Sequence, residues 1–145
     1  MKCITQDKEY NCGPTALRFL LGLYDIDATV EQLEELTGCT EADGTSHDGI
    51  KKALLHFGLK WVSWDGAHVS TLEEFLPAIV NYQYCDNDGC DGHYSVILGH
   101  GHNLFVLYNP FNGEIETIPD DELQKKWYSQ RYGKEWFIQI INPKL

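Results

Sequence analysis

A cysteine and an upstream glutamine stand at positions where they could act together on a carbonyl group. Cys12 opens the segment CGPTALRFLLGLY, whose apolar residues recur at helical spacing, so we expect Cys12 at a helix N-terminus. There the helix dipole and the unpaired N–H groups would favour the thiolate, the form of cysteine that attacks carbonyls. Gln6 stands six residues upstream, where its amide could join the Cys12 N–H in an oxyanion hole. Taken singly, Cys12 also fits a buried structural thiol and Gln6 a solvated side chain.

A base for this thiol follows from the expected geometry of a hairpin. HYSVILG and NLFVLYN flank a short turn, and a hairpin centred on Gly101 places His93 opposite Asn109. Asn109 could then accept a hydrogen bond from one imidazole nitrogen and leave the other free to face a thiol. The sequence therefore predicts a thiolate–imidazolium pair of Cys12 and His93, oriented by Asn109. This prediction depends on register, because a shift of one residue turns the side chains to opposite faces.

The elements that must position these residues are helices first and strands afterwards. Capping residues Thr29, Ser46 and Ser70 predict three helix starts after the first helix, and Pro77 limits the last of these helices. The expected helices cover 12–24, 30–38, 47–57, a short stretch before 77, and 120–127. The expected strands cover 78–84, 93–99, 103–109, 114–118 and 136–141, with 60–64 as a sixth. This order predicts an α+β fold in one domain, 1–145, with N-terminal helices packed on an antiparallel sheet.

Bulk properties exclude several classes of partner. The formal net charge of −11 and the absence of a Lys/Arg cluster argue against nucleic acid. No apolar run reaches the length of a signal peptide core or a membrane span. Five cysteines, an odd number without framework spacing, indicate a reducing compartment with at least one free thiol, so we expect a cytoplasmic protein.

Two further groups of residues carry weaker signals. Cys85 and Cys90 bracket an Asp/Asn-rich stretch that could be half a metal site or a disulfide, but a loop leading into the His93 strand fits better. The other five histidines are expected at the surface, without a role, at positions 47, 56, 68, 100 and 102.

Taken together, these motifs resemble the papain-like peptidases that process bacteriocins with double-glycine leaders. The resemblance consists of Gln6 before NCGPTAL, then GTSHDGIKKALLHFGL, GHYSVILG and YNPFNGEIETIP, from about residue 4 to about residue 128. It implies a papain-like fold with Gln6 in the oxyanion hole, Cys12 as nucleophile, His93 as base and Asn109 as orienter. Many members carry Asp at the position of Asn109, whereas papain-type enzymes use Asn.

The resulting hypothesis is a cysteine endopeptidase that acts on a protein or peptide substrate and needs no metal or organic cofactor. The same residues could serve amide or isopeptide chemistry, as in a deamidase, a transglutaminase-like enzyme or a deconjugating enzyme. A third hypothesis is a binding module that keeps the fold without turnover, and a fourth is a metal-binding module that uses Cys85 and Cys90. The sequence leaves substrate identity and oligomeric state open.

Overall fold

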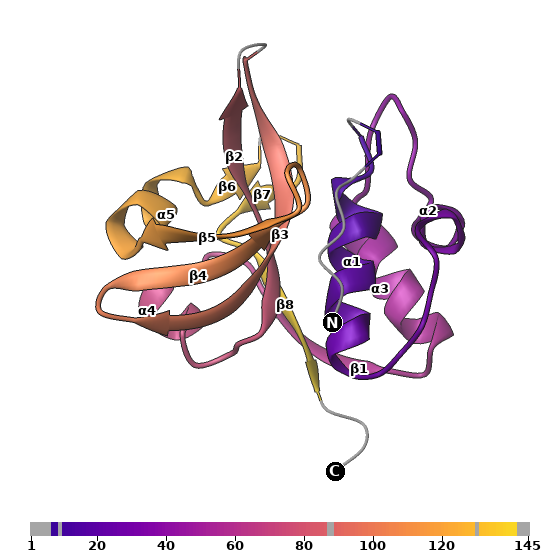
Figure 1. Cartoon of the computed structure of the whole chain (residues 1–145), viewed down its shortest axis with the longest axis horizontal. Coiled ribbons are helices and arrows are strands. Elements are labelled where there is room, and N and C mark those ends of the chain that lie inside the picture. Colours follow the sequence, from indigo (N-terminus) through magenta and orange to yellow (C-terminus); the bar gives the residue numbers. More distant parts are fainter. Residues whose placement is uncertain (1–6, 9, 87–88, 130, 142–145) are drawn as a thin grey trace.

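A six-stranded antiparallel sheet forms the centre of the molecule, a computed structural model that describes residues 7–8, 10–86, 89–129 and 131–141. The strands lie in the order β1-β8-β2-β3-β4-β5 (Figure 1). Their bounds are β1 (Lys60–Trp64), β2 (Ala78–Asp86), β3 (Gly89–Gly101), β4 (Leu104–Asn109), β5 (Glu114–Pro119) and β8 (Phe137–Ile141). Strands β6 (Tyr128–Ser129) and β7 (Gly133–Lys134) pair separately.

Helices pack on both faces of this sheet. On one side lie α1 (Cys12–Leu23), α2 (Val30–Thr37) and α3 (His47–His56), and on the other lie α4 (Val69–Leu72) and α5 (Asp120–Lys126) (Figure 1). The predicted α+β fold, with N-terminal helices against an antiparallel sheet, is therefore confirmed. Two short helices cover the far face because β3 and β4 also carry apolar side chains there, which must be shielded from water.

The helix boundaries follow from local capping in two of the three predicted cases. The Thr29 side chain accepts from the Gln32 N–H at 3.1 Å, and the Ser46 hydroxyl accepts from the Gly49 N–H at 3.0 Å. The predicted cap at Ser70 is wrong. His68 caps α4 instead, because its Nδ1 accepts from the Ser70 N–H at 3.1 Å, and the helix is only four residues long.

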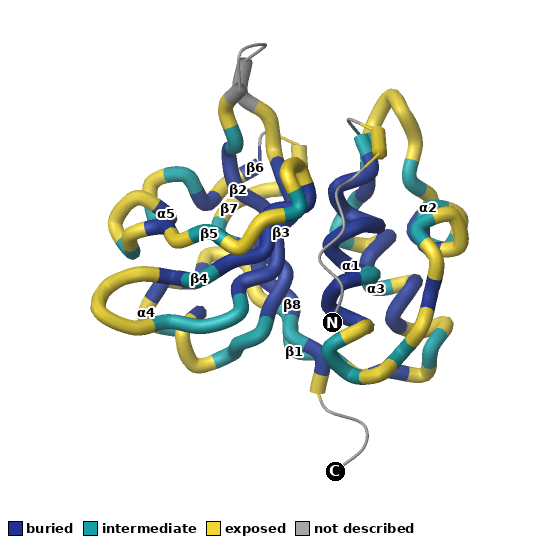
Figure 2. The backbone as a smooth tube through the Cα atoms, in the orientation of Figure 1, coloured by how far each residue is buried: buried dark blue, intermediate teal, exposed yellow. Residues whose placement is uncertain are grey.

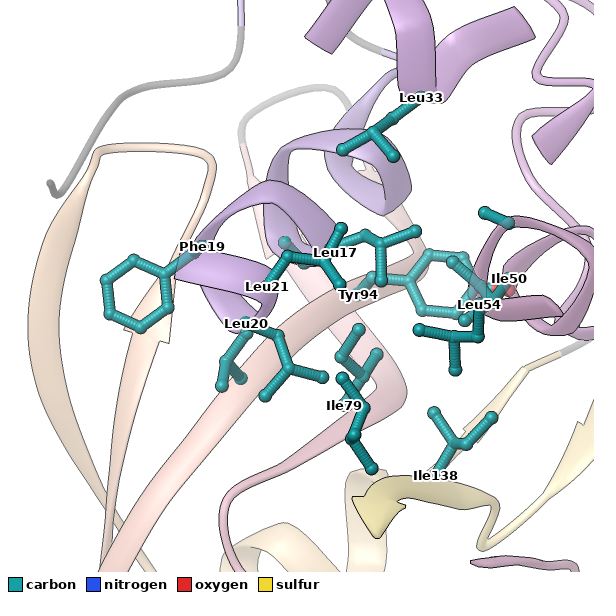
Figure 3. Close-up of a cluster of buried hydrophobic side chains, with 14 of the residues drawn as sticks. Leu17, Phe19, Leu20, Leu21, Leu33, Ile50, Leu54, Ile79, Tyr94 and Ile138 are labelled. Atoms are coloured by element: carbon teal, nitrogen blue, oxygen red, sulfur yellow. The ribbon is translucent and has the colours of Figure 1, made fainter. Parts of the chain in front are cut away.

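Apolar residues of α1 fix this helix along the middle of the sheet. Leu17, Leu20 and Leu21 are fully buried and belong to the cluster that includes Ile79 and Ile138 of the sheet (Figure 3). The Phe19 ring also stacks on Tyr108, with ring centroids 4.0 Å apart. Figure 2 shows α1 buried along most of its length, whereas α2 exposes its outer side. The N-terminus of α1 is thus held by burial against β3 and its neighbours.

The β3–β4 hairpin turns at His102 and Asn103, later in the chain than the sequence predicts. His102 and Asn103 both have positive φ, 53° and 62°, as a two-residue turn of type I′ requires, and Gly101 pairs with Leu104. The prediction of a hairpin centred on Gly101 is therefore wrong. Further along, the register shifts between Ile97 and Gly99, so that Val96 pairs with Tyr108.

None of the described helices is long and apolar enough to cross a membrane.

The N-terminal turn of α1 sits directly against the loop that leads into α3. A Cβ added at Gly13 would lie 2.8 Å from Thr45 Cβ, an atom bonded to the backbone that cannot swing away. We expect Gly13→Ala to lower the free energy of unfolding by about 1–3 kcal/mol, measured by urea denaturation.

Gly22 is the matched control, since the same helix leaves open space around it. Gly22→Ala should raise the free energy of unfolding by up to about 1 kcal/mol. Equal effects of the two substitutions would contradict the close packing at Gly13.

Candidate active site

Cys12 is the first residue of α1, as the sequence predicts. The residue before it, Asn11, is fully buried, but its side chain does not cap the helix. Instead, its Nδ2 donates to Asp7 Oδ1 at 2.6 Å and its Oδ1 accepts from the Lys8 N–H at 3.2 Å. Asn11 thereby ties the segment before the helix to the helix start, a contact that sequence reasoning missed. Gln6 lies outside the described residues, so its predicted place next to Cys12 is untested.

The Cys12 sulfur lies against β3, at the residue that follows the predicted base. Hydrogen bonds from the backbone N–H groups of Tyr94, Gly13 and Cys12 itself favour the thiolate. The side chain is only 9% exposed, however. The fold therefore brings the predicted nucleophile next to the backbone of the predicted base.

His93 and Asn109 meet in a hydrogen bond, with His93 Nε2 and Asn109 Oδ1 2.8 Å apart. They are not directly opposed, because Val96 pairs with Tyr108 rather than with residue 106, a shift of two residues from the predicted register. A shift of two keeps both side chains on one face and makes them diagonal neighbours, which longer side chains can bridge.

The irregularity in β3 is what preserves this shared face. At the turn, His100 pairs with Phe105 and Gly101 with Leu104. If this register continued along β3 without a bulge, Asn109 would pair with Val96. Asn109 and His93 would then point to opposite faces of the sheet. The bulge adds one residue to β3 and so returns His93 and Asn109 to the same face of the sheet.

Three contacts fix the Asn109 amide. Its Oδ1 accepts from the Phe111 N–H at 2.9 Å in addition to the contact with His93, and its Nδ2 donates to Glu116 Oε1 at 2.7 Å. Because Oδ1 can only accept, His93 Nε2 must carry the proton, and Nδ1 of the neutral ring keeps its lone pair. Sequence reasoning missed Glu116, although the alternation of EIETIP places it on the same side of its strand as Glu114.

Comparison with known protein families assigns the chain to one of them. Residues 1–130 match the Peptidase C39 family. The chain belongs to the Peptidase C39 family. It is therefore a cysteine peptidase, as the motifs around Cys12 and His93 indicate.

The curated relative is a transport protein much longer than this chain. The chain is 28% identical over 144 residues to the lactococcin-G-processing and transport ATP-binding protein LagD of Lactococcus lactis subsp. lactis. This alignment covers 99% of the chain but 19% of that protein, so the chain spans about a fifth of the length of this relative.

Two solved structures share the fold. The peptidase domain of Streptococcus ComA, a bifunctional ABC transporter of a quorum-sensing pathway, superposes with a TM-score of 0.76 at 19% identity, covering 94% of this chain and 95% of that one. A double glycine motif protease from an AMS/PCAT transporter, solved with its leader peptide, gives 0.76 at 20% identity, covering 94% and 88%.

Aromatic rings enclose the His93 imidazole in this member of the family. His93 pairs with Tyr82 across β2 and β3, and the Tyr84 ring lies 4.9 Å from it, between centroids. Tyr84 in turn contacts the exposed Phe111 ring at 5.2 Å. The imidazole is thus covered by two tyrosines of β2, and Phe111 of the β4–β5 connection lies against one of them.

Burial favours the neutral forms of both reactive groups. Burial raises the pKa of Cys12 to about 11, despite the three backbone N–H groups. Burial also lowers the pKa of His93 to about 4, against the opposing effect of the Asn109 hydrogen bond. Burial therefore opposes the predicted thiolate–imidazolium pair, because desolvation disfavours the charged form of each group.

The sequence predicts a loop between Cys85 and Cys90, but the two strands extend into this segment. Strands β2 and β3 continue to pair as far as Asp86 and Gly89, with Cys85 opposite Cys90, and Cys85 is disulfide-bonded. The side chain of Cys90 is outside the described part of the chain. Of the described cysteines, Cys12 and Cys39 are free.

Two histidines that the sequence assigns to the surface have defined contacts. His47 stacks on Trp136 with ring centroids 3.8 Å apart, and its Nδ1 lies 2.9 Å from the Tyr94 hydroxyl. His100 lies between two carboxylates, with Nε2 2.8 Å from Asp120 and Nδ1 3.3 Å from Glu73. Both nitrogens of His100 already face carboxylates, so this group is better described as an ion-pair cluster than as a metal site.

The lowered pKa of His93 makes stability depend on pH. The unfolded chain takes up this proton near pH 6.5, whereas the folded protein takes it up near 4, so stability is complete above pH 6.5 and is lost as pH falls toward 4. We expect His93 to contribute a loss of about 1 kcal/mol between pH 7.5 and 5.5. Urea denaturation at the two pH values, on the wild type and on His93→Gln, measures this contribution. An equal pH dependence of both proteins would contradict it.

The neutral state also predicts low reactivity of the thiol. At pH 7.5, Cys12 should react with iodoacetamide more slowly than Cys39, which is more exposed, and the rate at Cys12 should rise above pH 9. Mass spectrometry resolves the two sites within one sample. Fast alkylation of Cys12 with an apparent pKa below 8.5, lost in His93→Ala, would instead establish the ion pair.

Proposed function

We propose that this peptidase cleaves a peptide after a Gly-Gly pair, using Cys12 as nucleophile, His93 as base and Asn109 as the residue that orients the base. The observation that carries the proposal is the contact of His93 Nε2 with Asn109 Oδ1, beside a sulfur held against the Tyr94 N–H. It leaves the Nδ1 lone pair of His93 as the acceptor for a thiol proton.

The proposed reaction begins with a neutral pair. His93 Nδ1 takes the Cys12 proton while the sulfur bonds to the peptide carbonyl carbon, so the charges appear only as the tetrahedral intermediate forms. The Cys12 N–H at the helix N-terminus and the Gln6 amide would stabilise the oxyanion. The imidazolium then protonates the leaving amine, and water releases the acyl group from sulfur. The role of Gln6 rests on its spacing from Cys12.

The preference for glycine fits the burial of the two reactive groups. Cys12 is 9% exposed and His93 is 6% exposed, so a substrate backbone must come close to a nearly closed site. Residues without side chains meet the least steric hindrance there. The names of two relatives, a lactococcin-G-processing transporter and a double glycine motif protease solved with a leader peptide, agree with this substrate class.

We also propose that residues 1–145 act as one catalytic unit and that it works in the cytoplasm, where Cys12 would stay reduced. The Cys85 disulfide opposes this location, because such bonds are rare in reducing compartments. Thiol counting by mass spectrometry on protein alkylated during lysis would decide it. An alkylated Cys85 supports the cytoplasm, and an oxidised Cys85 contradicts it.

The proposed reaction predicts cleavage of synthetic peptides that contain one Gly-Gly pair. Products should end at the second Gly, and replacing that Gly with Val should abolish cleavage, as followed by mass spectrometry. Cys12→Ala should lower turnover by at least about 1,000-fold because the covalent intermediate cannot form.

Cys39→Ala is the matched control, since it removes the other free thiol among the described residues and should leave turnover unchanged. A side-chain amide converted to acid without chain cleavage would indicate a deamidase and contradict the proposed peptidase specificity.

A further inference from the structure

Glu116 stands behind the proposed orienting residue, on the side opposite His93. The three side chains come from neighbouring strands: His93 from β3, Asn109 from β4 and Glu116 from β5. Asn109 pairs with Glu114, so Glu116 is its diagonal neighbour, just as Asn109 is the diagonal neighbour of His93. The contacts are 2.8 Å from His93 Nε2 to Asn109 Oδ1 and 2.7 Å from Asn109 Nδ2 to Glu116 Oε1.

An asparagine in this place can be reversed, and the two orientations have opposite consequences. With Oδ1 toward the ring, Nε2 is protonated and Nδ1 can accept a proton. With Nδ2 toward the ring, Nε2 must accept, so the proton moves to Nδ1 and the side that would face a thiol has no lone pair. An aspartate would not have this problem, because both of its oxygens accept.

The surroundings of Asn109 select the first orientation. A carboxylate only accepts hydrogen bonds, so Glu116 requires the NH2 group to point toward it. The Phe111 N–H only donates, so it requires the oxygen at the other end. Asn109 is fully buried. A reversed amide would turn its NH2 group toward the Phe111 N–H and its oxygen toward the Glu116 carboxylate, so neither hydrogen bond could form.

We propose that Glu116 is a positioning residue that holds the Asn109 amide in one orientation and thereby places the proton of neutral His93 on Nε2. This inference rests on the proposed function, in which His93 Nδ1 takes the thiol proton. Glu116 also places a negative charge one amide away from the ring, which favours the imidazolium that forms during the reaction.

The first test needs no substrate. Glu116→Gln keeps the size of the side chain but offers both a donor and an acceptor, so only the Phe111 N–H still selects the orientation of the Asn109 amide. Long-range ¹H–¹⁵N spectra of the histidine rings at pH 7.5 identify the protonated nitrogen, with His93→Gln to assign the signals. We expect the proton on Nε2 in the wild type and a population with the proton on Nδ1 in Glu116→Gln.

Glu114→Gln is the matched control, because it removes the same charge from the same side of β5 at an exposed position. It should leave the His93 spectrum and turnover as in the wild type. In Glu116→Gln, we expect kcat to fall about 10- to 100-fold while KM changes little, since Glu116 acts through the Asn109 amide.

The second test is rescue by an aspartate. Asn109→Asp alone places two carboxylates in contact and should fold less stably and turn over slowly. Asn109→Asp combined with Glu116→Gln has two accepting oxygens at position 109 and a donor behind them, so it should exceed either single variant in kcat. A role of Glu116 in sheet stability alone predicts additive losses instead.

The outcomes separate this inference from the proposed function. An unchanged His93 tautomer in Glu116→Gln, or the absence of rescue in the double variant, overturns the role of Glu116. Failure of the wild type to cleave any Gly-Gly peptide overturns the proposed function, whereas the ring spectra still decide the role of Glu116.

Discussion

The structure depends on one contact that crosses two strands, the hydrogen bond between His93 and Asn109. An imidazole and an amide reach one another only if both strands present them on the same face, so the contact constrains register, turn and twist together. The type I′ turn at His102–Asn103 and the bulge between Ile97 and Gly99 are the local features that satisfy this constraint. Neither is needed to pair two strands, but both are needed to pair these two side chains.

The proposed nucleophile, Cys12, is positioned by helix packing and not by strand pairing. Leucines of α1 bury against Ile79 and Ile138 (Figure 3). Phe19 stacks on Tyr108, the residue before Asn109. The stack therefore links the helix that carries Cys12 to the strand that carries Asn109. Close contact between Gly13 and Thr45 fixes the position of the first turn of this helix. The relatives at 19% and 20% identity keep this fold, which is expected when pattern and volume rather than identity specify a core.

Burial fixes the orientation of the Asn109 amide and also disfavours charge on Cys12 and His93. A fully enclosed Asn109 cannot exchange partners with water, so its amide direction is defined by Phe111 and Glu116. The same enclosure raises the pKa of Cys12 and lowers that of His93. In the proposed reaction, charge separation therefore waits for the substrate, whose developing oxyanion would be stabilised by backbone N–H groups.

Local sequence determined the order of the elements, the helix position of Cys12, the caps at Thr29 and Ser46, and the two strands that carry His93 and Asn109. These features depend on side chains a few residues apart, and a single chain displays such periodicity and capping directly. Only the tertiary structure decided the bulge, the stacking of His47 on Trp136, and Glu116 behind Asn109. It also decided the direction of two pKa shifts, because the desolvation that raises the pKa of Cys12 and lowers that of His93 comes from residues that the chain brings together only on folding.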